Sequence, residues 1–238
     1  MKQSCLLDGN GEPKMIRNFA VAIGLYRVTA DGRIEVAVFQ YRRLAPKLEH
    51  FSTWRLFCGT QEIDRAKPET LFEALNREVN GEGASIATTD LAFANLKLLY
   101  GCVVPDDSDR ERLLHAKVAF AAEYAGGTLR STEMTDRGIG GNGQPSEEQL
   151  SAVEWCEIEE LMKRMRTGEK AKNIEPSPRF HQIALAHLLH KVAETSHDGV
   201  SLRYAHLLQR TQLVGSDPLE FRHIKTYMTA LDQAAVAA

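Results

Sequence analysis

Apolar and β-branched residues alternate with polar ones along the first third of the chain. Two such runs flank Asp31-Gly32, and this dipeptide between alternating runs is typical of a tight β-hairpin, because glycine readily adopts the positive φ of the turn. The pattern predicts strands over about residues 18–29 and 33–42. Shorter apolar runs predict further strands at about 54–58, 95–103, 115–124 and 151–158.

Other stretches repeat their apolar residues every three or four positions, which is the period of an α-helix. The first of them begins after Pro68, and proline favours the first helical turn. Its residues Leu71, Leu75 and Val79 then fall on one face. The remaining predicted helices lie at about 159–169, 176–194, 201–213 and 218–234.

The order of these elements predicts the fold class and the domain organisation. Strands followed by helices, with one helix in the middle, indicate an α+β fold built as an α/β/α sandwich. The chain of 238 residues fits one domain over residues 17–195, with an irregular leader at 1–16 and a helical extension at 196–238. Residues 125–147 are rich in Gly, Ser and Thr, so we expect a long loop there.

Composition and charge narrow the class of protein. Hydrophobic residues make up 43% of the chain, which is enough for a sizeable core. The net charge of -3 argues against sequence-independent binding of nucleic acid, which requires a basic face. Neither a long apolar span nor a secretory pattern is visible, so we expect a soluble cytoplasmic protein. The four cysteines are scattered, which indicates reduced thiols in a core.

Charged residues on the first predicted helix form a candidate site. Glu78 and Glu82 are four residues apart, so they lie one turn apart on one face, where two carboxylates repel unless a cation lies between them. Hard cations such as Mg²⁺ prefer oxygen ligands and often bind a phosphate as well. Glu69, Glu73 and Arg77 follow at i, i+4 and i+8, which predicts an ion pair between Arg77 and Glu73, near Glu69. An ordinary solvated helix face is the alternative.

The stretch around this helix resembles the Nudix box, the loop-helix-loop signature of the Nudix hydrolases. In that signature a Gly-rich turn leads to Glu, seven residues, Arg-Glu, a hydrophobic residue, any residue, Glu-Glu, any residue and Gly. Here Glu69 is followed by seven residues and then by Arg77-Glu78-Val79-Asn80, and Glu82 falls on the second paired glutamate. Residues 58–62 resemble the turn before the box, and the wider likeness covers about residues 18–192. It is most like the members that act on ADP-ribose and nucleoside diphosphate sugars.

The resemblance implies a role for each matching residue. In the family, the Glu after the Arg and the paired glutamates bind Mg²⁺ or Mn²⁺, which supports attack of water on a diphosphate bridge of a nucleoside derivative. By that likeness Glu78 and Glu82 are metal ligands. The carbonyl oxygen of Gly59 and the side chain of Glu62 are further candidates, and Arg77 braces the helix.

The likeness also points to acids and arginines outside the box. Members that act on ADP-ribose place the catalytic base on a loop before the last strand, where Glu147 and Glu148 stand here. We expect Glu148 to serve as the base and Glu147 to contact substrate, with solvent-facing loop acids as the alternative. Arg42 and Arg43 are candidates for phosphate contacts, since guanidinium matches phosphate geometry, and a plain surface pair is the other interpretation.

Three departures from the signature leave two hypotheses about function. Gly81 stands in place of the first paired Glu, Ala84 replaces the final Gly, and residues 64–67 resemble an insertion. A missing carboxylate should weaken metal binding. The first hypothesis is a divergent, homodimeric Nudix hydrolase that cleaves a nucleoside diphosphate derivative such as ADP-ribose with Mg²⁺ or Mn²⁺. The second is a catalytically impaired module that binds a nucleotide or nucleotide sugar, as a sensor or regulator with a DNA- or protein-binding tail.

Overall fold

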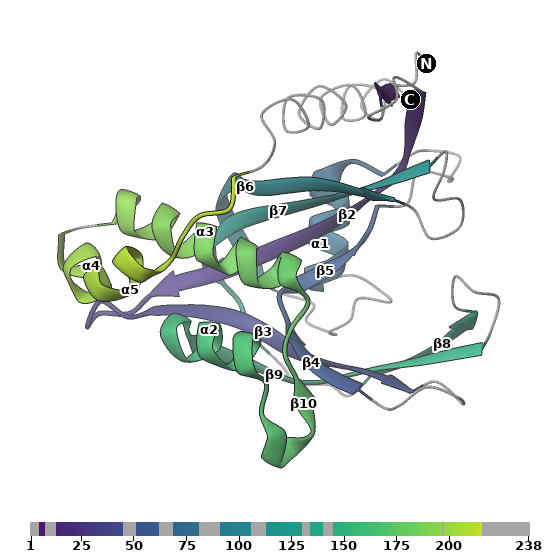
Figure 1. Cartoon of the computed structure of the whole chain (residues 1–238). Coiled ribbons are helices and arrows are strands. Elements are labelled where there is room, and N and C mark those ends of the chain that lie inside the picture. The colour runs from purple at the N-terminus through teal and green to yellow at the C-terminus, as the bar shows by residue number, and fades with distance from the viewer. Residues whose placement is uncertain are drawn as a thin grey trace.

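A mixed β-sheet with helices on both faces forms the body of the protein (Figure 1). The computed structural model describes residues 5–7, 13–44, 51–61, 69–80, 91–105, 113–129, 134–139, 145–196 and 198–215. Within them the strands are β1 (Cys5–Leu7), β2 (Pro13–Val28), β3 (Ile34–Leu44), β4 (Phe51–Arg55), β5 (Phe57–Thr60), β6 (Ala92–Pro105), β7 (Leu113–Gly126), β8 (Met134–Ile139), β9 (Pro145–Glu157) and β10 (Ile174–Glu175). The helices are α1 (Leu71–Asn80), α2 (Ile158–Thr167), α3 (Arg179–Thr195), α4 (Asp198–Arg203) and α5 (Ala205–Arg210), with a 3-10 turn at Lys170–Lys172.

The predicted hairpin at Asp31-Gly32 is confirmed and lies at the centre of the sheet. Gly32 has a φ of 78°, and its backbone N–H donates to the carbonyl oxygen of Thr29. Beyond the turn, β2 and β3 pair only over residues 26–28 and 34–36. The two strands then diverge, because each pairs with different neighbours.

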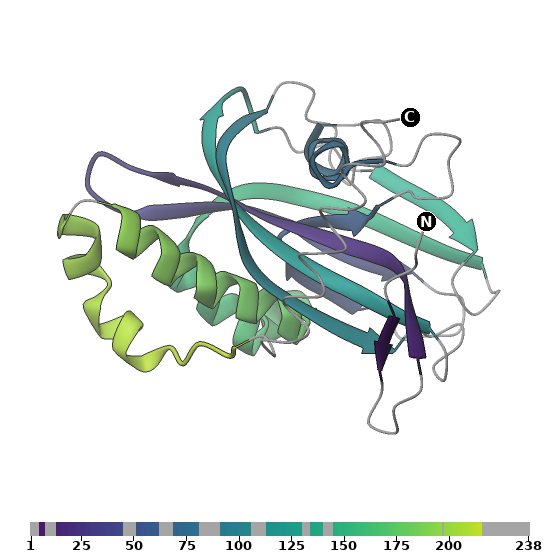
Figure 2. The same cartoon turned by 90° about the horizontal axis from the view of Figure 1, so that it is seen from above.

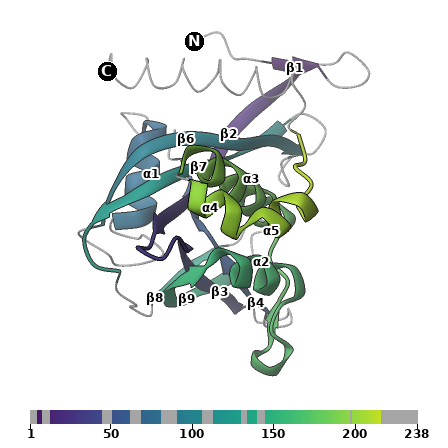
Figure 3. The ribbon, with the colours of Figure 1, turned by 90° about the vertical axis from the view of Figure 1, so that its left-hand side faces the viewer.

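This divergence divides the sheet into two wings. β2 pairs with β1 and β5 in antiparallel fashion and with β7 in parallel, and β7 in turn pairs with β6. We call these five strands the β2 wing. β3 pairs with β4 and β9. β4 in turn pairs with β10, and β9 with β8, and these five strands are the β3 wing. In Figure 3 the labelled strands of the β2 wing lie above those of the β3 wing. The chain crosses from one wing to the other at Leu56, between β4 and β5.

Helices cover the two faces of the sheet, as the predicted α/β/α sandwich requires (Figure 2). On one face Leu71, Leu75 and Val79 of α1 are buried in a core with Phe19 and Phe57, so the predicted apolar face of this helix is confirmed. On the other face α2 and α3 pack over a second core that includes Val38, Leu161 and Leu188. The α+β fold class is therefore shown.

Some boundaries differ from the prediction because distant strands pair. The expected loop at 125–147 contains the whole of β8 and the start of β9, which pair with each other in a hairpin. The expected irregular leader contains β1 and the start of β2, which are also paired. In both cases a partner strand outweighs a composition that favours a loop.

The residues after α3 pack back onto the sandwich. The predicted helix at 201–213 is two short helices that are interrupted at Tyr204, whose buried hydroxyl accepts from Ile34 N at 2.9 Å and donates to Glu157 Oε1 at 2.5 Å. His187 and His190 of α3 lie within hydrogen-bond distance of the carbonyl oxygens of Val214 and Thr211. The predicted helix at 218–234 lies outside the described residues. No helix of the described part of the chain is long and apolar enough to span a membrane.

Candidate functional site

A capping box fixes the start of α1. Thr70 Oγ1 accepts from Glu73 N at 3.1 Å, and the Glu73 carboxylate accepts from Thr70 N at 2.8 Å. This reciprocal pair satisfies two backbone donors that a helix start leaves open. The predicted ion pair between Glu73 and Arg77 is therefore wrong, because Glu73 turns back to the first turn of the helix.

Arg77 instead joins Glu69 and Glu78. Its Nε donates to Glu69 Oε1 at 2.7 Å and its Nη2 to Glu69 Oε2 at 3.1 Å, while Nη1 donates to Glu78 Oε1 at 2.5 Å. Nη2 also donates to the carbonyl oxygen of Thr60 at 2.9 Å, which ties α1 to the end of β5. Hydrogen bonding to Glu69 and the negative charges of Glu78 and Glu69 hold the pKa of Arg77 above its usual value. This network connects α1 to Glu69 and to the end of β5, and the bracing role of Arg77 stays a prediction.

Glu78 lies directly against Gly59. A Cβ atom on Gly59 would overlap the carboxylate of Glu78, so only glycine leaves room for this contact. Glu78 is 5% exposed, although it carries a carboxylate. The Arg77 guanidinium supplies the counter-charge that a buried carboxylate requires. Two predicted metal ligands, one on α1 and one on β5, are thus neighbours in space.

These neighbours suit a hard divalent cation in their chemistry. A carboxylate and a backbone carbonyl are both oxygen donors, which Mg²⁺ and Mn²⁺ prefer. The carboxylate of Glu78 lies against the backbone of Gly59, and the carbonyl oxygen of Gly59 is the second predicted ligand. Within the described residues no group of three or more His, Cys, Asp or Glu side chains could by itself hold a metal. The other predicted ligands, Glu82 and Glu62, lie outside the described residues.

Replacing Arg77 with Met should lower the free energy of unfolding by about 3 kcal/mol, because Glu69 and Glu78 then stay buried without their counter-charge. The expected fall in melting temperature is about 6–12 °C, measured by scanning calorimetry. Arg33→Met is the matched control. It removes an ion pair with Asp31 whose two side chains are 45% and 54% exposed, so it should cost less than about 1 kcal/mol. Equal losses in the two variants would contradict a structural role for the Arg77 network.

A cavity of about 360 Å³ opens beside Gly59. Its walls come from strands of both wings and from the start of α3. They include Tyr41 and Arg55 of the β3 wing, Lys117 of the β2 wing, and His181 of α3. Sequence reasoning proposed none of the last three as site residues. The one local sign was the position of Lys117 between Ala116 and Val118, which are both buried.

The other predicted site residues lie on β3 and β9, in the β3 wing. Arg42 is exposed and alternates with Tyr41, so it lies on the face of β3 away from α1. Glu147 and Glu148 are strand residues of β9, so the loop predicted for them is wrong. Arg43 is the register partner of Glu148 across β3 and β9. The strand pairing therefore brings the backbones of Arg43 and Glu148 side by side, on the wing that does not carry Gly59.

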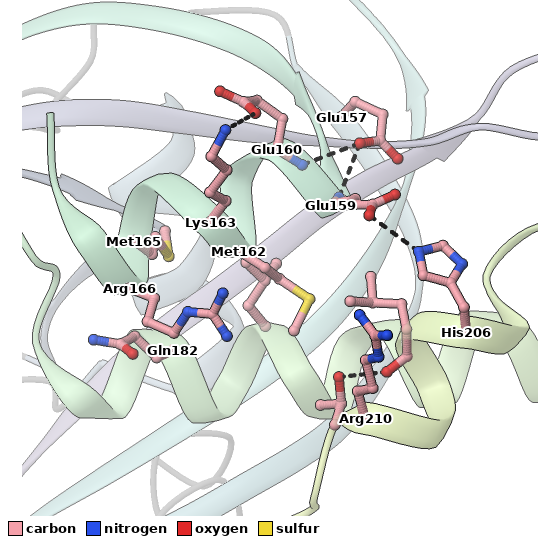
Figure 4. Close-up of a pocket in the computed structure, with 13 residues that line it drawn as sticks. Glu157, Glu159, Glu160, Met162, Lys163, Met165, Arg166, Gln182, His206 and Arg210 are labelled. Atoms are coloured by element: carbon pink, nitrogen blue, oxygen red, sulfur yellow. Dashed lines mark hydrogen bonds and ion pairs between the residues drawn. The ribbon is translucent and has the colours of Figure 1, made fainter.

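A second hollow, of about 590 Å³, lies between α2, α3 and α5 (Figure 4). Both acidic and basic side chains line it, and two pairs of them lie close together. His206 lies 3.0 Å from Glu159, and Lys163 lies 4.0 Å from Glu160. Glu157 accepts from two backbone N–H groups at the start of α2. This groove holds none of the residues to which the box resemblance pointed.

Comparison with known proteins finds similarity only among solved structures, where 49 chains match. A Nudix hydrolase from M. smegmatis, RenU, is 14% identical over 81% of this chain and 97% of its own, with a TM-score of 0.42. An ADP compounds hydrolase is 15% identical over 82% of this chain and 86% of its own, with a TM-score of 0.42. No family model and no curated protein sequence matches.

Proposed function

We propose that this protein is a divergent Nudix-type hydrolase that cleaves the diphosphate bridge of a nucleoside diphosphate derivative. The observation that carries the proposal is the contact of the buried Glu78 carboxylate with Gly59, braced by Arg77. Gly59, Arg77 and Glu78 all belong to the stretch that resembles the box. Glu78 contacts both of the others, although 18 residues separate it from Gly59 in the sequence. A solvated helix face would need neither the burial of Glu78 nor a glycine beneath it.

The residues of the chain divide the chemistry among them. Glu78 and the Gly59 carbonyl would hold Mg²⁺ or Mn²⁺, with Glu82 and Glu62 as further ligands in the proposal. A bound divalent cation lowers the pKa of water and neutralises charge on a diphosphate. Arg77 keeps the Glu78 carboxylate aimed through its hydrogen bond.

The proposal also assigns residues of the β3 wing. Glu148 would accept the proton of the attacking water, and Glu147 would contact the substrate. Arg42 and Arg43 are the proposed contacts for phosphate oxygens, and Arg42 would contact a phosphate other than the scissile diphosphate, because it lies on the face of β3 away from α1. The exposure of Arg42 leaves its guanidinium accessible to a ligand. ADP-ribose and nucleoside diphosphate sugars are the proposed substrates, and a homodimer is the proposed assembly.

One observation favours a second candidate, a nucleotide-binding module with impaired catalysis. Gly81 supplies no carboxylate at a position where the resembling family has one. In addition, one oxygen of Glu78 already accepts from Arg77. Fewer oxygen donors give weaker cation binding.

A turnover assay separates the two candidates. ADP-ribose, nucleoside diphosphate sugars, dinucleoside polyphosphates and nucleoside triphosphates are incubated with the protein and with Mg²⁺, Mn²⁺ or EDTA. Metal-dependent release of two phosphate-ended products from one of them supports the hydrolase. Nucleotide binding by calorimetry without turnover on any compound would support the binding module and reject the hydrolase.

A further inference from the structure

Basic side chains line the cavity beside Gly59. Arg55 comes from β4, His115 and Lys117 from β7, and His181 from the first turn of α3. None of the described residues that line this cavity is an aspartate or a glutamate. Basic groups from three separate elements thus converge on a single cavity. The groove between α2 and α5 differs, because glutamates line it as well, and two of them lie near His206 and Lys163.

Two of these cations have no carboxylate partner among the described residues, namely Arg55 and Lys117. Arg55 donates from Nε to Thr53 Oγ1 at 3.2 Å, and its guanidinium lies 3.6 Å above the ring of Tyr41. That stacking fixes the plane of the guanidinium while leaving its charge unneutralised. Lys117 is half-buried on the neighbouring wing. Partly buried cations without counter-charge attract an anion into the space between them.

His181 adds an unsatisfied polar group. It is 6% exposed, and its Nδ1 is a buried atom without a hydrogen-bond partner. Burial, together with the charges of Arg55 and Lys117, lowers the pKa of His181 to about 3, so the ring is neutral near pH 7. A neutral imidazole carries one N–H group, which can donate to an oxygen atom that reaches it. Its place in the first turn of a 17-residue helix adds the positive end of the helix dipole.

We propose that this cavity is an anion subsite, which takes a phosphate or carboxylate group that the substrate carries beyond its scissile diphosphate. Lys117 and Arg55 supply the charge, and His181 supplies a neutral donor. The volume of about 360 Å³ is on the order of ten water molecules, so the cavity can also hold part of the group that bears the anion. The identity of the ligand rests on the proposed function, whereas binding of the anion itself requires no hydrolysis.

The first test measures binding of inorganic pyrophosphate and of inorganic phosphate by titration calorimetry, in EDTA and at constant ionic strength. Lys117→Gln and Arg55→Gln should each weaken binding about ten-fold or more, since a charge-assisted hydrogen bond is lost. Arg166→Gln removes an exposed charge in the groove of Figure 4 and should leave binding unchanged. Melting temperatures show that each variant is folded.

The second test distinguishes the two sources of the anion under turnover conditions. UDP-glucose is compared with UDP-glucuronic acid for a carboxylate, and NAD with NADP for a phosphate. The subsite predicts a KM at least about ten-fold lower for the anionic member of one pair, and loss of that preference in Lys117→Gln. If no anion binds to the wild-type protein, or if Arg166→Gln weakens binding as much as Lys117→Gln, the subsite is rejected. Anion binding that requires Lys117, without hydrolysis of any compound, would support the subsite and reject the hydrolase.

Discussion

Glu78→Gln should lower kcat/KM for the best diphosphate substrate by about a thousand-fold. Gln keeps the shape of the side chain and can still accept from Arg77, but it removes the negative charge that faces a cation. Metal ions contribute several kcal/mol of stabilisation to developing charge, and each 1.36 kcal/mol corresponds to a factor of ten in rate. The fall should be partly offset by raising the Mg²⁺ concentration, because the variant binds the cation more weakly.

Glu160→Gln is the matched control for this substitution. Glu160 is an exposed acid of α2 that pairs with Arg164 and Lys163 on the surface, away from Gly59. Its replacement should leave kcat/KM within about two-fold, since surface ion pairs contribute little to stability or geometry. Steady-state kinetics of both variants over a range of Mg²⁺ concentrations measure the difference. If Glu78→Gln retained a tenth or more of the wild-type activity, Glu78 would not be a metal ligand.

Gly59→Ala should impair both activity and stability. The added methyl group would occupy the space of the Glu78 carboxylate, so α1 and β5 must separate or Glu78 must turn away. Overpacking of this kind costs about 1–3 kcal/mol, which corresponds to a fall in melting temperature of about 2–12 °C for a protein of this size. A displacement of about 1 Å at a catalytic group can cost a hundred-fold in rate, and we expect a loss of kcat/KM of at least that size.

Gly199→Ala is the matched control, because it adds the same methyl group at a position where there is room for it. Gly199 lies in α4, and no atom lies within 4 Å of a Cβ placed on it. Alanine is favoured over glycine in a helix interior by about 1 kcal/mol, and Gly199 lies in the first turn of α4, so this variant should melt no lower than the wild-type protein and keep its activity. Calorimetry and the turnover assay compare the two variants. A Gly59→Ala protein as stable and active as Gly199→Ala would show that the contact between Gly59 and Glu78 is not required.

The part of the candidate site that could be predicted is the part that lies close together in the sequence. The apolar period of α1 is a local pattern that predicted the buried face of the helix, and the spacing from Glu69 to Arg77 predicted that these two residues lie near each other. The partner of Arg77 was predicted less well. Glu73 has the right helical spacing, but the open backbone donors at the start of the helix compete for its carboxylate.

Contacts between distant elements explain what could not be predicted. Glu147 and Glu148 follow a Gly-rich stretch, and only the pairing of β9 with β3 and β8 makes them strand residues. Arg55, Lys117 and His181 are separated by more than sixty residues at each step, and they meet because the two wings diverge beneath the start of α3. No spacing rule within one element connects them.

Binding of Mn²⁺ is the measurement that tests the central claim most directly, because it does not depend on the choice of substrate. The paramagnetic resonance signal of free Mn²⁺ is followed as wild-type protein or the Glu78→Gln variant is added. The proposed site predicts loss of the free signal with the wild-type protein and at least about ten-fold weaker binding by the variant. Equal binding by the two proteins, or no binding by the wild-type protein, would contradict a metal site at Glu78 and Gly59.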